Sequence, residues 1–280
     1  MPKVLTEDAI AQYEREGNFF PIPILCEDEV ADLRGRLEAF EAEQGQPIQG
    51  GHRNKSHLLF KWLDDLMRNP RILDVVEDLI GRDILCWNTI FWIKEARSPS
   101  YVSWHQDLNY WGLDATDLVS AWLALSPATV ESGCMRVLPG SHAEEALPHD
   151  DTFHVDNMLT RGQEIAVEVD EADAVDVVLE AGQASLHHGH LFHSSGPNNT
   201  GHRRIGAAIR YIAPSMKQKT GDRTLVAHVA GEDRHGHFTV APPPEGRLLE
   251  ADFALCRQDM AVKGRILYEG VEGKRGQRYR

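Results

Sequence analysis

The sequence is poor in cysteine and in basic residues. Only four cysteines occur, and no two of them form a CxxC pair: Cys26, Cys86, Cys134 and Cys256. This spacing argues against a disulfide framework and a zinc knuckle, so we expect reduced and mostly buried thiols. Lysine and arginine number 29 against 43 acidic residues, which gives a net charge of −14. Such a balance argues against a nucleic-acid partner and an anionic membrane surface, because both attract basic patches.

Long apolar runs are missing as well. The N-terminus turns acidic at Glu7, before the apolar part of a secretory signal could form. No run approaches the roughly 20 apolar residues of a transmembrane helix, so we expect a cytoplasmic protein. Because 42% of the 280 residues are hydrophobic, the chain can nevertheless build a substantial core.

Residues 1–82 have the apolar spacing of helices. The pattern occurs in three segments, 30–40, 58–67 and 72–80, and the last of them ends at Gly81. We expect these helices to pack outside a sheet and to support it.

Residues 83–214 have a different texture, with short β-branched and aromatic runs between Gly, Pro, Asn and Asp. The predicted strands are Ile84–Lys94, Leu118–Leu125, Cys134–Leu138, Ala174–Leu179, Ala184–His187 and Ile205–Ile212. Many short strands with turns between them predict a mostly β fold with flanking helices, namely a double-stranded β-helix, the cupin-like jelly roll. Residues 143–173 are too long for an ordinary connection and predict a lid or a mobile insert. Since no linker divides the chain, we expect one domain over 1–280, with residues 215–280 as a C-terminal extension.

A candidate metal-binding pair lies in the segment WHQD at residues 104–107. In an extended strand, residues two apart point to the same side, so His105 and Asp107 could address one metal ion. An HxD pair also occurs by chance, so it needs a third ligand. The dense histidine group downstream offers four candidates: His187, His188, His190 and His193. Two histidines and one carboxylate form the facial triad of iron(II) oxygenases, which leaves three positions open for a co-substrate and dioxygen.

Arg204 adds context to this pair. It lies eleven residues after His193 and opens a predicted strand that we expect beside strand 184–187. A guanidinium group is the natural bidentate partner for the distal carboxylate of a keto-diacid that chelates a metal. Strand alternation predicts that only one of Arg203 and Arg204 faces the interior.

Two polar residues of strand 84–94 are further candidates. Asn88 and Lys94 have the same parity and would share one face of the strand, which could be the interior face. From there Lys94 could assist in binding 2-oxoglutarate. Gln106 alternates away from the metal pair, and we expect it to support the metal site without binding the ion.

Four pieces of sequence follow one another in a specific order. They are HQDLNY from His105, DLVSAW from Asp117, SGCMRVLPGSH from Ser132, and HSSGPN from His193 with the pair RR at 203–204. Together they resemble the phytanoyl-CoA dioxygenase family of iron(II)/2-oxoglutarate oxygenases, over about residues 87–214. The C-terminal 65 residues add little to this resemblance.

The resemblance implies a role for each matching position. His105, Asp107 and His193 would be the iron ligands, because only His193 stands at the family's distance before Arg204. Arg204 would pair with the C5 carboxylate of 2-oxoglutarate, Ser195 would hydrogen-bond that carboxylate, and Trp122 would line the pocket.

The resemblance also implies an activity. We expect an enzyme that uses iron(II), 2-oxoglutarate and O2, releases succinate and CO2, and hydroxylates an unactivated C–H bond of a small or medium-sized metabolite. Halogenases of this family carry Ala or Gly where this chain has Asp107, which favours hydroxylation. Desaturation or epoxidation by the same iron chemistry is an alternative. So is a non-catalytic cupin-like metal-binding or sensor protein, although a mere metal cage has no need of Arg204 and Ser195, and so is a zinc hydrolase with the same ligands.

The sequence leaves the substrate and the oligomeric state open. Residues 143–173 and the C-terminal segment 216–280 are the expected sources of substrate contacts. The polar candidates in the first of them are His149, His154, Asn157 and Arg161, although solvated loop residues are the commoner explanation for such side chains.

Overall fold

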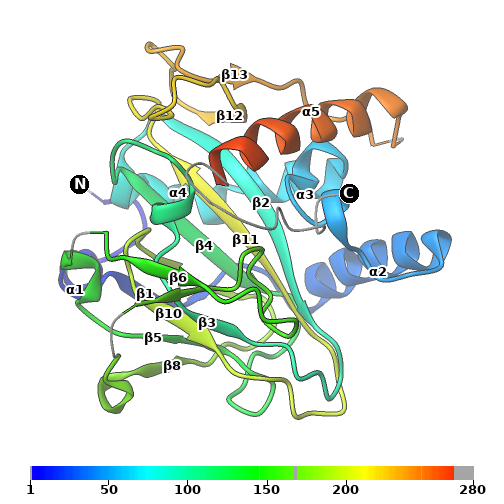
Figure 1. The fold of residues 1–280 in the computed structure, drawn as a ribbon. Coiled ribbons are helices and arrows are strands. Elements are labelled where there is room, and N and C mark those ends of the chain that lie inside the picture. Colours follow the sequence, from blue (N-terminus) through cyan, green and yellow to red (C-terminus); the bar gives the residue numbers. More distant parts are fainter. Residues whose placement is uncertain (1, 145, 167–168, 247, 268–280) are drawn as a thin grey trace.

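Two β-sheets face each other at the centre of the protein (Figure 1). The computed structural model describes residues 2–144, 146–166, 169–246 and 248–267. The larger sheet has the strand order β1-β9-β4-β11-β2-β12-β13, and the smaller one has the order β3-β10-β5-β8. All neighbouring strands are antiparallel except β12 and β13, which are parallel. A separate pair, β6 with β7, lies outside the smaller sheet.

The strands are β1 (Asn18–Pro23), β2 (Ile84–Lys94), β3 (Val102–His105), β4 (Leu118–Ala124), β5 (Met135–Val137), β6 (His149–Asp151), β7 (Gln163–Ile165), β8 (Val175–Val177), β9 (Gln183–His187), β10 (His193–Ser195), β11 (Arg204–Ile212), β12 (Leu225–Ala230) and β13 (Thr239–Val240). The helices are α1 (Glu7–Glu16), α2 (Glu27–Gln44), α3 (Lys61–Met67), α4 (Pro70–Ile80) and α5 (Glu250–Leu267).

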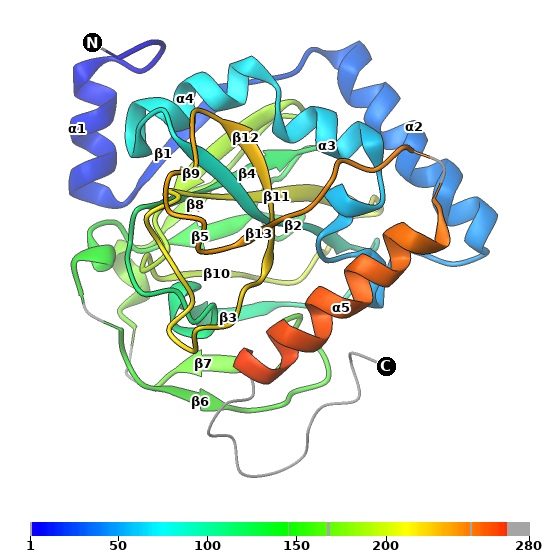
Figure 2. The same ribbon diagram turned by 90° about the horizontal axis from the view of Figure 1, so that it is seen from above.

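Helices α1 to α4 cover the outer face of the larger sheet, whereas β6 and β7 lie on the opposite side of the molecule (Figure 2). The apolar residues of these four helices form one core with the outward side chains of the larger sheet. Leu37 of α2 and Val76 of α4, for example, belong to the same core as Ile209 of β11. The expectation that the N-terminal helices pack outside a sheet is therefore confirmed. None of the described helices is long and apolar enough to cross a membrane.

Strand β11 shows how alternation divides the two faces of the larger sheet. Ile205, Ala207, Ile209 and Tyr211 belong to the core under the helices. Ala208, of the opposite parity, belongs to a second core between the two sheets, with Trp122 and Val137. Because side chains alternate along a strand, Arg204, Gly206 and Arg210 also face this interior.

Helix α5 is fixed to the larger sheet by a buried ion pair. Asp259 lies 3.1 Å from the ammonium group of Lys55, and both side chains are fully buried. The Asp259 carboxylate also accepts a hydrogen bond of 2.7 Å from the backbone N–H of Leu225. The C-terminal extension is thus joined to strand β12.

All six predicted strands are present, with ends that differ by one or two residues. Strand β1 was missed because two prolines, Pro21 and Pro23, obscure its pattern. Proline is tolerated there because β1 is the edge strand of the larger sheet. The region 1–82 therefore contributes a strand to the sheet in addition to its helices.

One predicted neighbour relation is wrong. The strand opened by Arg204, β11, does not lie beside β9, because β4 lies between them. His193 belongs to another strand, β10, in the smaller sheet. The two chain segments thus approach each other across the interior between the sheets, which sequence order alone does not reveal.

The described residues of the segment 143–173 include a layer that packs against strand β3. Ile165 of β7 packs against Trp104 and Phe192, and the amide of Asn157 donates a hydrogen bond of 2.8 Å to Ser103 Oγ. These contacts describe a packed element, and a role as a lid stays a prediction. The cysteines are free, and three of the four are buried, as expected.

Candidate active site

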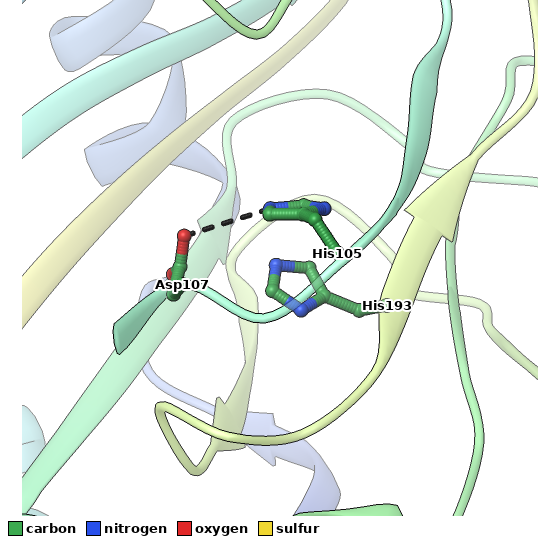
Figure 3. A group of neighbouring side chains, drawn as sticks. All are labelled: His105, Asp107 and His193. Atoms are coloured by element: carbon green, nitrogen blue, oxygen red, sulfur yellow. Dashed lines mark ion pairs between the residues drawn. The ribbon is translucent and has the colours of Figure 1, made fainter. Parts of the chain in front are cut away.

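Three side chains meet at one end of the interior, as Figure 3 shows. One ligand atom from each of His105, Asp107 and His193 lies within 4.8 Å of the others, and all three residues are buried. His105 ends β3 and is paired directly with His193, which begins β10. Their ring centroids are 4.1 Å apart, and His105 Nε2 lies 3.5 Å from Asp107 Oδ1. Among the described residues, this is the one group of three His, Cys, Asp or Glu side chains with such spacing.

Asp107 reaches the histidines by a route that differs from the predicted one. Strand β3 ends at His105, and Asp107 has the helical dihedrals φ −61° and ψ −47° before the short helix Leu108–Tyr110. The turn is held by a hydrogen bond of 2.9 Å from Leu108 N–H to Gly189 O. The carboxylate therefore joins the two histidines through a bend and not through the two-residue repeat of a strand.

Both histidines are held in the tautomer that a metal needs. The Nδ1 atom of His105 lies 2.9 Å from Ser103 O, and that of His193 lies 2.9 Å from Leu191 O. Because a carbonyl oxygen only accepts, each Nδ1 carries the proton and each Nε2 keeps a free lone pair. Burial, reinforced by the neighbouring His105, holds the pKa of His193 well below its ordinary value, so this ring is neutral.

Asp107 is ionised in this buried place. Burial alone would raise the pKa of its carboxyl group, but Arg210, His105 and His187 outweigh this effect and hold the pKa well below its ordinary value. Two imidazoles and one carboxylate thus converge on one point. This donor set suits iron(II), with open positions for other ligands.

The other end of the interior carries two buried basic side chains. Arg204 and Lys94 are paired across β11 and β2, and they are 2% and 0% exposed. Neither forms an ion pair with an acidic residue in the described part of the chain, and Arg204 Nε has no hydrogen-bond partner there. Lys94 donates a hydrogen bond of 2.7 Å to Ser195 Oγ. Because buried charges require a partner, this group suits an external carboxylate.

Burial lowers the pKa values of both basic side chains. It lowers the pKa of Lys94 to about 6, and the nearby Arg204 contributes to this shift. Burial also lowers the pKa of Arg204 to about 10. The Trp122 ring lies 5.3 Å from the Arg204 guanidinium carbon. A Cβ atom at Gly206 would lie 2.0 Å from this ring, so only glycine lets Trp122 lie flat over β11 and line the interior beside Arg204.

Two other sequence candidates have different partners. Arg203 faces away from the interior and pairs with Glu41 (2.8 Å) and Glu95 (3.0 Å), so the predicted alternation between Arg203 and Arg204 is confirmed. Asn88 shares the interior parity of Lys94, but its side-chain oxygen accepts a hydrogen bond of 3.2 Å from Lys55 N–H. That contact helps to fix the segment beside β2.

Of the rival histidines, His187 lies nearest to the metal group. Its Nε2 is 3.9 Å from Asp107 Oδ2, and its ring centroid is 5.1 Å from that of His193. The rings of His188 and His190 pack against each other (5.7 Å). His190 lines a separate cavity of about 340 Å³ together with His149 and Arg161.

Gln106 links the metal segment to residues 143–173, in agreement with its expected supporting role. Its backbone N–H donates to His149 Nε2 (3.1 Å), and its side-chain oxygen accepts from Leu147 N–H (2.9 Å). Leu147 O in turn lies 2.8 Å from His149 Nδ1, which fixes the tautomer of His149. Sequence reasoning saw His149 as a substrate candidate and missed this contact.

Sequence reasoning also missed Arg210. Its guanidinium Nη2 lies 3.4 Å from both oxygens of Asp107, and its carbon lies 4.4 Å from the centre of the Trp111 ring. The only signal in the sequence was an arginine within an apolar strand, at a position whose side chain points into the interior. His187 and Ser120 occupy neighbouring positions on the adjoining strands.

Residues 2–206 match the family model of phytanoyl-CoA dioxygenase. The chain belongs to the phytanoyl-CoA dioxygenase family. The predicted resemblance is thereby confirmed, and with it the enzyme class, an iron(II)- and 2-oxoglutarate-dependent dioxygenase.

Individual relatives differ in how much they share with this chain. The solved structure of the non-heme monooxygenase ThoJ is 34% identical, with a TM-score of 0.80 over 94% of this chain and 98% of ThoJ. L-proline trans-4-hydroxylase of Streptomyces griseoviridis is 29% identical over 73% of this chain and 85% of its own length. A probable hypophosphite dioxygenase of Stutzerimonas stutzeri is 28% identical over 62% of this chain and 61% of its own. The expected jelly-roll fold is confirmed by these matches.

Proposed function

We propose that this protein hydroxylates an unactivated C–H bond of a small or medium-sized metabolite, with release of succinate and CO2. His105, Asp107 and His193 would hold iron(II). When bound, the iron supplies the oxidising chemistry with 2-oxoglutarate and O2, and the protein positions the reactants and excludes water. The relatives that act on proline and on hypophosphite support a small substrate.

The observation that carries this proposal is the pair of buried basic side chains at the end of the interior away from the triad. Arg204 and Lys94, with Ser195 beside them, form a receptor for the distal carboxylate of 2-oxoglutarate. Trp122 lines the interior next to Arg204. A metal-storage or sensor protein would not need such a receptor, and a zinc hydrolase would not need it either.

The carboxylate of Asp107 supports hydroxylation over halogenation, because it fills the coordination position that a halide would need. Desaturation and epoxidation by the same iron chemistry would give other products from the same substrate. Mass analysis separates hydroxylation, which adds one oxygen atom, from desaturation, which removes two hydrogen atoms. Epoxidation of an alkene also adds one oxygen atom, and NMR of the product separates it from hydroxylation.

The test is succinate formation from 2-oxoglutarate with iron(II) and ascorbate, across a panel of small metabolites. We expect substrate-dependent succinate that requires both iron and O2. Turnover that persists with zinc and without O2 would instead favour a hydrolase, and no succinate with any metabolite would favour a binding protein. We also propose a cytoplasmic location, which imaging of a tagged full-length chain can test.

A further inference from the structure

A row of three polar residues borders Asp107 on the inner face of the larger sheet. The strand register pairs Arg210 of β11 with Ser120 of β4, and Ser120 with His187 of β9. Residues paired in this way point to the same face, with Cβ atoms about 4.5–5.5 Å apart. The three residues are 7%, 0% and 3% exposed. We call Arg210, Ser120 and His187 the polar row.

Each member of the polar row has a polar atom without a partner. Arg210 Nε, Ser120 Oγ and His187 Nδ1 form no hydrogen bond with any described residue. Buried polar atoms of native proteins are nearly always hydrogen-bonded. Three such atoms in adjacent strands therefore indicate a ligand with several hydrogen-bonding oxygens.

Arg210 is held ready for an anion. Its guanidinium stacks on Trp111, whose ring lies 5.0 Å from that of Trp87, and Lys263 Nζ lies 4.0 Å from the Trp87 ring on the side of α5. Only one of its nitrogens, Nη2, approaches Asp107, and the two distances of 3.4 Å are long for charged hydrogen bonds. Most of the guanidinium fork thus stays available for a carboxylate.

The balance of charges in the site with iron(II) and 2-oxoglutarate bound would also favour an anionic group on the substrate. The two positive charges of iron(II) would be balanced by Asp107 and the metal-bound carboxylate of 2-oxoglutarate, and the distal carboxylate would be balanced by Arg204. Arg210 would then share Asp107 with the iron, which would leave one positive charge of the buried site without a full counter-charge, and this is unfavourable. An anionic group on the substrate removes this imbalance.

Position separates Arg210 from the co-substrate receptor. Arg210 follows Arg204 by six residues on β11, which is about 20 Å along the strand. The two arginines thus serve opposite ends of the interior. We propose that the polar row binds the carboxylate of the substrate, so that the substrate is a small carboxylic acid such as a free amino acid. This inference rests on the proposed function and specifies its substrate class.

The first experiment uses the wild-type protein under anaerobic conditions with iron(II) and 2-oxoglutarate. Formation of the visible charge-transfer band of the iron–2-oxoglutarate complex tests the proposed function. The twenty proteinogenic L-amino acids and their C-terminal amides are then added one at a time. We expect at least one amino acid to perturb the band and to stimulate succinate formation in air, with its amide needing a concentration about 10- to 100-fold higher.

Variants then test the polar row at saturating iron. Arg210→Gln should keep the band but raise the half-saturating amino-acid concentration about 10- to 100-fold. Arg210→Lys should raise the half-saturating amino-acid concentration less than Arg210→Gln, because lysine keeps the positive charge. The effect should not vanish, because lysine lacks the two-nitrogen fork of the guanidinium group. Ser120→Ala should give a smaller, few-fold effect. Lys217→Gln removes one exposed positive charge outside the row and is the matched control.

Other outcomes overturn the proposal. If Arg210→Gln raises the requirement for 2-oxoglutarate and leaves that for the amino acid unchanged, the carboxylate at Arg210 is that of the co-substrate. Amides that act as well as acids, or a panel in which no acid perturbs the band, contradict the substrate class while the proposed function stands. A wild-type protein that forms no band with 2-oxoglutarate contradicts the proposed function, and the inference with it.

Discussion

Strand β11 carries two buried arginines that face the same interior, and their surroundings differ. Arg204 lies at the beginning of the strand beside Lys94 and Ser195, with no acidic partner in the described chain. Arg210 lies six residues later, stacks on Trp111 and approaches the ionised Asp107. In the proposed function Arg204 would depend entirely on an external anion, whereas Arg210 also helps to keep the Asp107 carboxylate charged.

We infer that the two ends of the interior depend on different partners. Loss of a group at the metal end should affect iron binding, and loss of a group at the Arg204 end should affect only the co-substrate. The following experiments test this separation.

The largest effect is expected at the metal end. His193→Ala removes a ligand whose Nε2 lone pair is directed by its contact with Leu191 O. We expect iron binding to weaken and succinate formation to fall by more than about 100-fold, because even loss of groups that only support metal ligands costs roughly 10- to 100-fold. Metal analysis and succinate assays check this. His190→Ala is the control, and equal losses in both variants would show that the choice of His193 is wrong.

The second-largest effect is expected when Arg204 is replaced. Arg204→Leu removes the charged fork and leaves the triad intact. We expect the half-saturating 2-oxoglutarate concentration to rise roughly 10- to 100-fold, the equivalent of about 1.5–3 kcal/mol for charged hydrogen bonds. Iron binding should not change. The matched control is Arg203→Leu, because Arg203 pairs with Glu41 and Glu95 on the other face. An unchanged 2-oxoglutarate requirement in Arg204→Leu would remove this role.

Lys94 gives the Arg204 end a dependence on pH. Because the pKa of Lys94 is lowered to about 6, its amine is mostly neutral at pH 8 and gains its charge as the pH falls through 6. A bound carboxylate favours the charged amine. We expect the affinity for 2-oxoglutarate to increase several-fold between pH 8 and pH 6, as measured by calorimetric titration. Lys94→Met should flatten this slope, and equal slopes in both proteins would contradict the prediction.

The smallest effect concerns the support of the metal segment. His149→Ala removes the acceptor of the Gln106 N–H bond and one contact between the metal segment and residues 143–173. We expect a loss of about 1 kcal/mol in the free energy of unfolding, or roughly 2 °C in Tm. His154→Ala, in an exposed part of the same stretch, is the control for thermal unfolding. A change in Tm no larger than that of the control would show that the contact contributes little.

Local patterns were sufficient for much of the fold. Strand Ile84–Lys94 and the helical segment 72–80, which the structure extends to Pro70–Ile80, were predicted because their side-chain periods, two and about 3.6, are set by the backbone. Strand β1 could not be read in this way, since its prolines break the pattern and only its edge position makes them acceptable. The order of the strands was also beyond local reasoning, and β11 was placed beside the wrong neighbour.

From the sequence alone we could predict the pair His105 and Asp107, the role of Arg204 and the family, because these predictions depend on residue types at short and fixed spacings. The tertiary structure shows how His193, which the family spacing had already selected, comes to lie beside that pair: β10 and β3 pair only after the chain has closed on itself. It also decided the meaning of Arg210, Ser120 and His187. These residues lie on three strands far apart in sequence, and only the sheet register brings their unpartnered atoms together beside Asp107.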